Sequence, residues 1–117
     1  MTCTVVIVDD STAFRLAARR LLEAGGLVVV GEAASGAQAV TVAVSQRPDV
    51  VLLDVQLPDT DGFAVCRELR TSGIPVVLCS VRDHAGRAAA CGAWGFIAKE
   101  HLSAARLVRL LRDAPDG

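Results

Sequence analysis

The sequence predicts an α/β domain in which five parallel strands form a sheet with helices on both faces. Short runs of valine, leucine and isoleucine alternate along its 117 residues with alanine-rich segments of helical period. Most of these apolar runs lack the polar–apolar alternation of a half-exposed strand, which indicates strands buried on both faces. Five strand–helix pairs in so short a chain favour a single domain built on a parallel sheet.

The first strand–helix pair has signals at both ends of its helix. Residues 5–8 form the first apolar run, and Ser11 after it can accept a hydrogen bond from the first turn of a helix. Gly25 and Gly26 are suited to end that helix, since glycine adopts the backbone conformation common after a last helical turn. The pair therefore extends to about residue 26.

The second pair begins with the strand expected at residues 27–30. In the helix that follows, apolar side chains recur three and then four residues apart, as on one helical face. These are Ala37, Val40 and Val44. This helix is expected to end before Pro48, because the residue before a proline is disfavoured in a helical conformation.

Three further strands are expected at residues 50–53, 76–79 and 96–98. The helix after the last of them has apolar residues at positions i, i+3, i+4 and i+7. These are Ala104, Leu107, Val108 and Leu111. We expect residues 1–112 to form the domain, and residues 113–117, which include proline and glycine, to be a tail or the start of a linker.

The composition excludes several classes of protein. Hydrophobic residues make up 52% of the chain and charged residues 21%, so an intrinsically disordered chain is not expected. The formal net charge of −1 gives no electrostatic basis for direct binding to nucleic acid or to an anionic membrane. No apolar run has the length of a transmembrane helix, and the N-terminus lacks the features of a signal peptide. We therefore expect a cytoplasmic location.

Polar residues follow four of the five expected strands. Asp9 and Asp10 follow the first strand, Asp54 the third, Ser80 the fourth and Lys99 the fifth. The carboxyl ends of parallel strands lie at one edge of the sheet, where ligands of open α/β sheets bind. These five residues should therefore share one small site.

Three neighbouring carboxylates repel one another, and a hard divalent cation relieves that repulsion. Taken alone, Asp9 and Asp10 could equally be N-capping acids of the first helix. Together with Asp54 they favour a metal site, and oxygen ligands of this kind suit Mg²⁺. Lys99 is the only lysine beside eleven arginines, and its compact charge suits a phosphoryl oxygen in a tight pocket better than a planar guanidinium does.

With these residues in view, the whole chain resembles a response-regulator receiver domain of bacterial two-component signalling. The resemblance rests on VDD at 8–10, LLDVQLPDTDG at 52–62, CS at 79–80 and GAWGFIAK at 92–99. The last segment is closest to the branch usually followed by a helix-turn-helix output domain. The resemblance implies a flavodoxin-like (βα)5 fold with strand order 2-1-3-4-5.

The resemblance also implies roles for the residues of the site. Asp54 is then the phosphoacceptor, which forms an acyl phosphate. Asp10, Asp54 and the backbone carbonyl of Gln56 hold Mg²⁺, with Asp9 acting largely through water. Lys99 pairs with the phosphoryl group. Ser80 and the switch aromatic Phe96 then carry the change to the face made by the fourth helix, the fifth strand and the fifth helix.

Three positions depart from the family pattern. Glu100 stands where a proline, usually in a cis peptide, often follows the lysine, so the geometry of the Lys99–Glu100 bond is open. Val81 stands where a small residue is usual beside the pocket. Gln56 lies at a position that the family varies. Trp94, two residues before Phe96, is expected to project to the same face of the strand as Phe96.

The implied partner is a sensor histidine kinase, and a homodimer could form through the face of the fourth helix, fifth strand and fifth helix or through the first and fifth helices. No catalysis beyond its own phosphoryl transfer and dephosphorylation is expected. Two alternatives remain: an interaction module no longer controlled by phosphorylation, and an aspartate-nucleophile phosphatase. The phosphatase is disfavoured because Gln56 occupies the place of its general acid. A nucleotide-binding module is disfavoured because no glycine-rich phosphate-binding motif is present.

Overall fold

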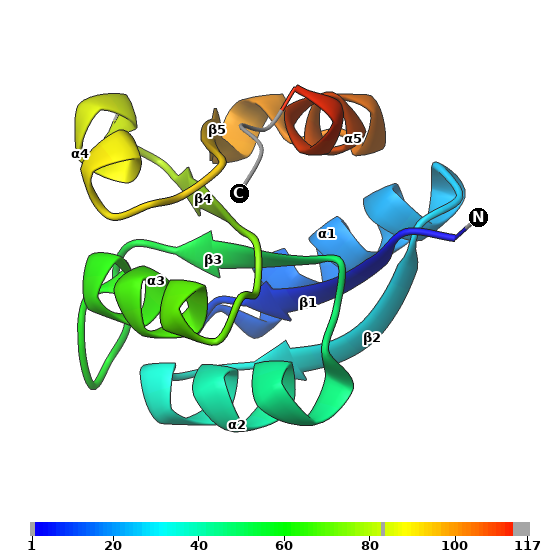
Figure 1. Ribbon diagram of the computed structural model, residues 1–117. Helices are drawn as coiled ribbons and strands as arrows, with labels where there is room; N and C mark the ends of the chain where they lie inside the picture. The colour runs from blue at the N-terminus through cyan, green and yellow to red at the C-terminus, as the bar shows by residue number, and fades with distance from the viewer. Residues whose placement is uncertain (1, 83, 114–117) are drawn as a thin grey trace.

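The computed structural model of the protein describes residues 2–82 and 84–113. The expected tail therefore lies outside the described residues, apart from Asp113 at the end of the last helix. The described chain forms a parallel sheet of five strands in the order β2-β1-β3-β4-β5 (Figure 1). The strands are Thr4–Val8 (β1), Val28–Ala33 (β2), Val50–Asp54 (β3), Val76–Ser80 (β4) and Gly95–Ala98 (β5). The predicted fold class and strand order are confirmed.

Helices cover both faces of the sheet (Figure 1). They are Thr12–Ala24 (α1), Gly36–Gln46 (α2), Gly62–Thr71 (α3), Ala85–Ala90 (α4) and Ala104–Arg112 (α5), with a short 3-10 turn at Lys99–His101 (η1). One buried cluster joins the sheet to α1 and α5 through Ala18, Leu22 and Leu107. The other joins it to α2, α3 and α4, with Phe63 its largest fully buried side chain. This division makes the sheet doubly wound.

The central strands are apolar throughout because both of their faces are covered. Every residue of β3 and of β4 is buried. Along these strands alternate residues belong to opposite clusters: Val51 and Leu53 face α2 and α3, whereas Val50 and Leu52 face α1 and α5. This is the arrangement that continuous apolar runs predict for a parallel sheet.

The second strand differs from its predicted range of residues 27–30, because β2 runs from Val28 to Ala33. Its later part includes Glu32, a charged residue that the apolar pattern does not mark as strand. The Glu32 carboxylate is held by two guanidinium groups of α1, with 3.2 Å to Arg15 Nε and 2.6 Å to Arg19 Nη1. An edge strand can carry such a residue because only one of its sides is paired.

The predicted helix signals are confirmed. Ser11 Oγ accepts a hydrogen bond from the backbone N–H of Phe14 at 3.1 Å, and α1 ends at Gly25. The second helix ends before Pro48, with Arg47 in the left-handed conformation at φ 47°. Within the described ranges, no helix is long and apolar enough to cross a membrane.

The expectation that Trp94 and Phe96 share a face is wrong. Trp94 packs against the cluster of α1 and α5, whereas Phe96 packs against the cluster of α2, α3 and α4. The physical reason is that β5 begins at Gly95, so the alternation of side chains along a strand does not extend back to Trp94. The Arg70 guanidinium lies 5.6 Å from the centre of the indole ring.

Gly62 is required where α3 meets the end of β3. A Cβ atom there would overlap the carbonyl oxygen of Asp54 and lie 2.8 Å from Val55 Cα. We therefore predict that Gly62→Ala lowers the free energy of unfolding by about 3 kcal/mol or more, as backbone displacement and overpacking at a buried site do. Gly86→Ala is the matched control, since a Cβ there meets nothing within 4 Å and alanine favours the interior of α4 by roughly 0.5–1 kcal/mol. Urea unfolding of both variants tests this; equal stabilities would contradict it.

Candidate functional site

The register of the sheet brings the predicted site residues to one edge. Val8 pairs with Leu53, so Asp9 lies level with Asp54 at the ends of β1 and β3. Ser80, the last residue of β4, pairs with Ala98 of β5. Lys99 follows Ala98 directly and begins η1. The backbone therefore delivers residues from four strand ends to one place, as the sequence predicts.

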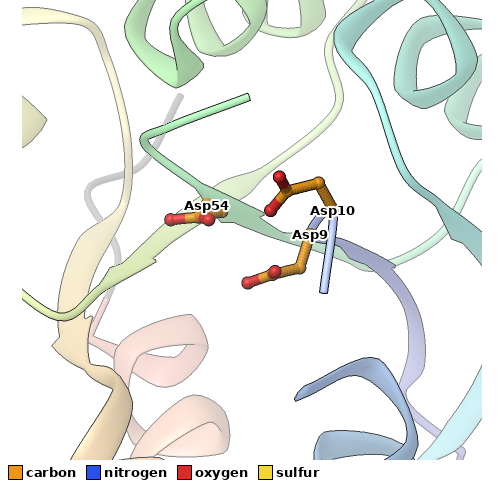
Figure 2. A group of neighbouring side chains, drawn as sticks. All are labelled: Asp9, Asp10 and Asp54. Carbon is orange, nitrogen blue, oxygen red and sulfur yellow. The ribbon is translucent and has the colours of Figure 1, made fainter. Parts of the chain in front are cut away.

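Three carboxylates converge at this edge (Figure 2). Carboxylate oxygens of Asp9, Asp10 and Asp54 all lie within 4.8 Å of one another. Asp9 is 1% exposed and Asp54 7% exposed, whereas Asp10 is exposed to solvent. The cluster is thus open on the side of Asp10 and buried on the side of the sheet, which allows a ligand to enter from solvent.

Lys99 supplies the positive charge of the cluster. Its Nζ lies 2.6 Å from Asp9 Oδ2 and 3.5 Å from Asp54 Oδ2. The short contact is therefore with Asp9, and the contact with Asp54 is at the limit of a hydrogen bond. Asp9 Oδ1 accepts a hydrogen bond from the backbone N–H of Ser11 at 2.8 Å. Asp9 thus orients the lysine, and the Asp54 carboxylate keeps much of its accepting capacity.

Phe14 of α1 is a site residue that the sequence analysis does not identify. The Lys99 ammonium lies 4.4 Å from the centre of its ring, a distance typical of a cation–π contact. The signal in the sequence is weak, since Phe14 is also on the apolar side of α1 and packs against the core with Ala18 and Leu22. Its contact with Lys99 depends on how α1 crosses the end of β5.

The local environment shifts the pKa values of both charged partners. Burial raises the pKa of the Asp54 carboxyl, and the neighbouring Asp9 charge raises it further, while Lys99 and the Gln56 N–H oppose the shift. Burial acts to lower the pKa of Lys99, but the Asp9 and Asp54 carboxylates outweigh it and the pKa is raised. The lysine is therefore charged, and one ammonium does not compensate the whole carboxylate cluster.

The fourth strand places Ser80 beside the acids. Ser80 is buried, and its Oγ accepts a hydrogen bond from the backbone N–H of Arg82 at 3.4 Å. Val81, which stands where the family usually has a small residue beside the pocket, is 75% exposed.

Phe96 is half-buried and lies beside the ring of His84. His84 begins α4 without a side-chain capping bond. Its ring makes edge contacts with Phe63 and Phe96, with ring centres 5.6 and 6.2 Å away. His84 therefore stands in the row of aromatic rings that connects the helix α3 with β5.

A groove lies beside the end of β3, lined by residues that follow Asp54 and not by the three acids. It has a volume of about 550 Å³ and runs between the loop after β3 and the loop after β4. Gln56 and Pro58 line one side, and Arg82 and His84 the other. The loop after β3 closes on itself, since Gln56 and Asp61 form a β-bridge and the Gly62 N–H donates to the Val55 carbonyl at 2.6 Å.

The Lys99–Glu100 peptide is trans, because the described residues contain no cis peptide.

The family model described as "Response regulator receiver domain" matches residues 5–112. The chain belongs to this family. It is therefore a receiver domain of two-component response regulators, and the resemblance seen in the sequence is confirmed. The match covers all five helices and, apart from Thr4 at the start of β1, all five strands of the structure.

Known proteins agree with this assignment. The response regulator MprA of Mycolicibacterium vanbaalenii is 36% identical, over 99% of this chain and 54% of that protein. A protein-glutamate methylesterase/protein-glutamine glutaminase of Anaeromyxobacter dehalogenans is 44% identical, over 84% of this chain and 29% of that protein. The signal receiver domain of the response regulator described as NarL from Mycobacterium tuberculosis superposes with a TM-score of 0.88 at 31% identity, over 96% and 98% of the two chains.

The chain spans about half the length of several relatives that it matches. Relatives of this receiver domain thus include a response regulator and a protein named as an enzyme. Family membership therefore establishes a signalling domain, and the activity of a longer protein is a separate matter.

The acid cluster fits a hard divalent cation. Its donors are carboxylate oxygens, the ligands that Mg²⁺ prefers. Asp9 Oδ2 is already paired with the Lys99 ammonium at 2.6 Å. The carboxylate oxygens of Asp10 and Asp54 would therefore be the ones left to bind such a cation directly.

The raised pKa of Asp54 predicts how the Asp54 charge affects the stability of the metal-free fold. Because the pKa of Asp54 is higher in the folded than in the unfolded state, ionisation of Asp54 favours unfolding. Asp54→Asn should therefore raise Tm at pH 7 in EDTA, where each kcal/mol corresponds to about 4 °C. The difference should shrink as the pH falls through the raised pKa, since protonation stabilises the wild-type fold.

The measurement is thermal unfolding by circular dichroism, with the exposed Glu68→Gln as a surface control. Added Mg²⁺ should raise Tm of the wild type more than that of Asp54→Asn, because it binds the folded state. A lower Tm for Asp54→Asn in EDTA at pH 7 would show that the Asp54 charge stabilises the fold.

Proposed function

We propose that this chain is a phosphoacceptor receiver domain whose Asp54 is phosphorylated in a Mg²⁺-dependent reaction by a partner histidine kinase. The observation that carries the proposal is the placement of Asp54 within 3.5 Å of Lys99 Nζ, in a cluster with Asp9 and Asp10 at the carboxyl edge of the sheet. Membership of the receiver family supports it.

Asp54 is the nucleophile in this proposal. It ends a fully buried strand, so its carboxylate is held on a rigid element. A carboxylate oxygen attacks the phosphorus of the donor, the donor's bond to phosphorus breaks with its electron pair leaving on the donor, and an acyl phosphate forms on Asp54. The exposed Asp10 marks the side of the cluster that is open to solvent, from which a donor would approach.

Lys99 stabilises the charge that the phosphoryl oxygens bring to the site. In the unphosphorylated structure its short contact is with Asp9. The ammonium can bind a phosphoryl oxygen on Asp54 while Asp9 still holds it from the other side. A compact ammonium with three donors suits both contacts at once. Phe14 restricts the ammonium from the α1 side.

Asp10, Asp54 and the backbone carbonyl of Gln56 would hold Mg²⁺, with Asp9 acting through water. The cation would supply positive charge that neutralises the carboxylates and the transferred phosphoryl oxygens. Asp10 is the exposed member of the cluster, so it faces the side from which a hydrated cation arrives. The chain's own contribution is to hold these oxygens close together before the cation binds.

Ser80 and Phe96 form the proposed switch. Ser80 Oγ is engaged by a weak contact, the Arg82 N–H at 3.4 Å, so it is free to donate its proton to a phosphoryl oxygen. Movement of Ser80 opens space toward Phe96, which lies half-buried beside His84. Turning of Phe96 would then alter the face of α4, β5 and α5, where a partner or a second copy of the chain could bind.

The output and the partner follow from the family rather than from contacts in this structure. A relative is the response regulator MprA, of which this chain covers 54%. We propose that the domain controls an output domain or partner, of the helix-turn-helix transcriptional type, and that it acts in the cytoplasm. We propose no catalysis by this domain beyond its own phosphoryl transfer and the hydrolysis of the resulting acyl phosphate.

Phosphorylation is tested directly by intact-mass measurement. With acetyl phosphate and Mg²⁺, the wild type should gain the mass of one phosphoryl group, and Asp54→Asn should gain none. Addition of EDTA should prevent labelling of the wild type, because the carboxylates then repel the incoming anion. Equal labelling of the wild type and Asp54→Asn would refute Asp54 as the acceptor.

A separate prediction concerns the shape of the cation at position 99. Lys99 Nζ lies 2.6 Å from Asp9 Oδ2 and 3.5 Å from Asp54 Oδ2. Lys99→Arg keeps the charge, but the wider guanidinium does not fit between these two carboxylates. We expect the rate of phosphorylation by acetyl phosphate to fall on the order of 100-fold, as when one preorganised charge-stabilising donor is lost. Arg106→Lys on the exposed side of α5 is the control. A rate within twofold of the wild type would show that charge alone suffices.

A further inference from the structure

The loop between β3 and α3 is attached to the start of α2 by one side chain. Asp59 Oδ1 accepts a hydrogen bond from the backbone N–H of Gly36 at 2.8 Å, and its Oδ2 accepts one from Ala37 at 3.0 Å. These N–H groups belong to the first turn of α2 and have no partner within the helix. The two bonds lower the pKa of the Asp59 carboxyl, so it is ionised near neutral pH.

The backbone of α2 at Gly36 also lies close to side chains of the loop and of α3. A Cβ atom on Gly36 would overlap Thr60 Cγ2 and lie 3.0 Å from Val65 Cγ2. Glycine at this position therefore permits the close approach that the Asp59 bonds require. The contact is a built junction between α2 and the loop rather than a chance meeting of surface groups.

The helix α2 has a capping residue of its own. Ser35 Oγ accepts a hydrogen bond from the Gln38 N–H at 3.2 Å, as an N-cap does. The first turn of α2 contains no acidic residue, so Asp59 provides the negative charge that favours a helix N-terminus, from another part of the chain. Because Ser35 already caps the helix, the added contact with Asp59 orders the loop as much as it orders α2.

The same loop begins at the proposed metal site. A β-bridge between Gln56 and Asp61 closes the loop, and the Gln56 N–H lies 3.5 Å from Asp54 Oδ1. The residues between the two bridge partners are Leu57, Pro58, Asp59 and Thr60. Only two residues therefore separate Gln56 from Asp59, so a movement of the Gln56 backbone is transmitted over a short segment to the first turn of α2.

We propose that Asp59 is a positioning residue, which holds the Gln56 loop against the first turn of α2 and thereby couples cation binding at the acid cluster to the order of that turn. This inference rests on the proposed function, since it assigns the Gln56 carbonyl to the metal site. The coupling is reciprocal by necessity: if an ordered α2 favours the cation, the cation favours an ordered α2. This coupling passes through one side of Asp54, and Ser80 and Phe96 lie on the other side.

Mg²⁺ titration followed by amide NMR shifts near the acid cluster tests the first half of the coupling. Asp59→Ala should weaken Mg²⁺ binding about three- to tenfold, below the roughly 10–100-fold loss typical when a group that touches a metal ligand directly is removed. Ser35→Ala is the matched control, because it removes one capping bond from the same helix end without touching the loop. Asp59→Asn keeps one acceptor oxygen and should give an intermediate affinity.

Hydrogen exchange of the Ala39 amide tests the other half. This amide bonds to the Ser35 carbonyl, so neither variant removes its partner. Saturating Mg²⁺ with beryllofluoride, a phosphoryl mimic, should slow its exchange in the wild type and in Ser35→Ala, and should leave it unchanged in Asp59→Ala.

Two outcomes would overturn the inference in distinguishable ways. If the wild type binds Mg²⁺ but Asp59→Ala binds it equally well, or if Ser35→Ala weakens binding as much as Asp59→Ala does, Asp59 has no positioning role and the proposed function stands. If the wild type shows neither Mg²⁺-dependent shifts at the acid cluster nor phosphorylation, the proposed function fails and this inference fails with it.

Discussion

The organising constraint of this structure is the repulsion among three carboxylates that a parallel sheet brings to one edge. Among the described residues, the one ammonium between Asp9, Asp10 and Asp54 is that of Lys99. Burial and the neighbouring Asp9 charge raise the pKa of Asp54 despite its ion pair with Lys99. The stability of the site therefore depends on the positive charge that it can recruit, which makes its state sensitive to cations.

The two loops at this edge are held by different kinds of contact. The loop after β3 is bridged within itself and bonded to α2 through Asp59. Among the described residues of the loop after β4, the Arg82 N–H donates to Ser80 Oγ at 3.4 Å, and the His84 ring makes edge contacts with Phe63 and Phe96. The first loop is therefore held by hydrogen bonds to the backbone, and the second is held in part by the packing of aromatic rings.

Much of the fold and of the site follows from the sequence because both depend on where apolar runs stop. Asp54 and Ser80 end two buried strands, Lys99 directly follows β5, and strand ends coincide at one edge of a parallel sheet. Contacts between elements that are distant in sequence are not encoded in this way. The ring of Phe14 beneath Lys99 and the bonds from Asp59 to α2 depend on crossing geometry.

The two errors of local prediction have local causes. Glu32 continues β2 because two arginines of α1 neutralise it, and hydropathy alone does not register such a partner. Trp94 faces away from Phe96 because it precedes β5, where strand alternation has not yet begun. In both cases the pattern was sound, but the boundary of the strand was displaced by one or a few residues.

The single lysine has a consequence for side reactions. Acyl phosphates transfer acyl groups to unprotonated amines as well as phosphoryl groups to carboxylates. In this chain the only side-chain ε-amine belongs to Lys99, and it is kept protonated and non-nucleophilic by the Asp9 carboxylate 2.6 Å away. All other side-chain cations of the lysine–arginine class are guanidinium groups, which are inert to such donors. The one side-chain amine of the chain is thereby protected from acylation by a small acyl phosphate, the kind of donor proposed to phosphorylate Asp54.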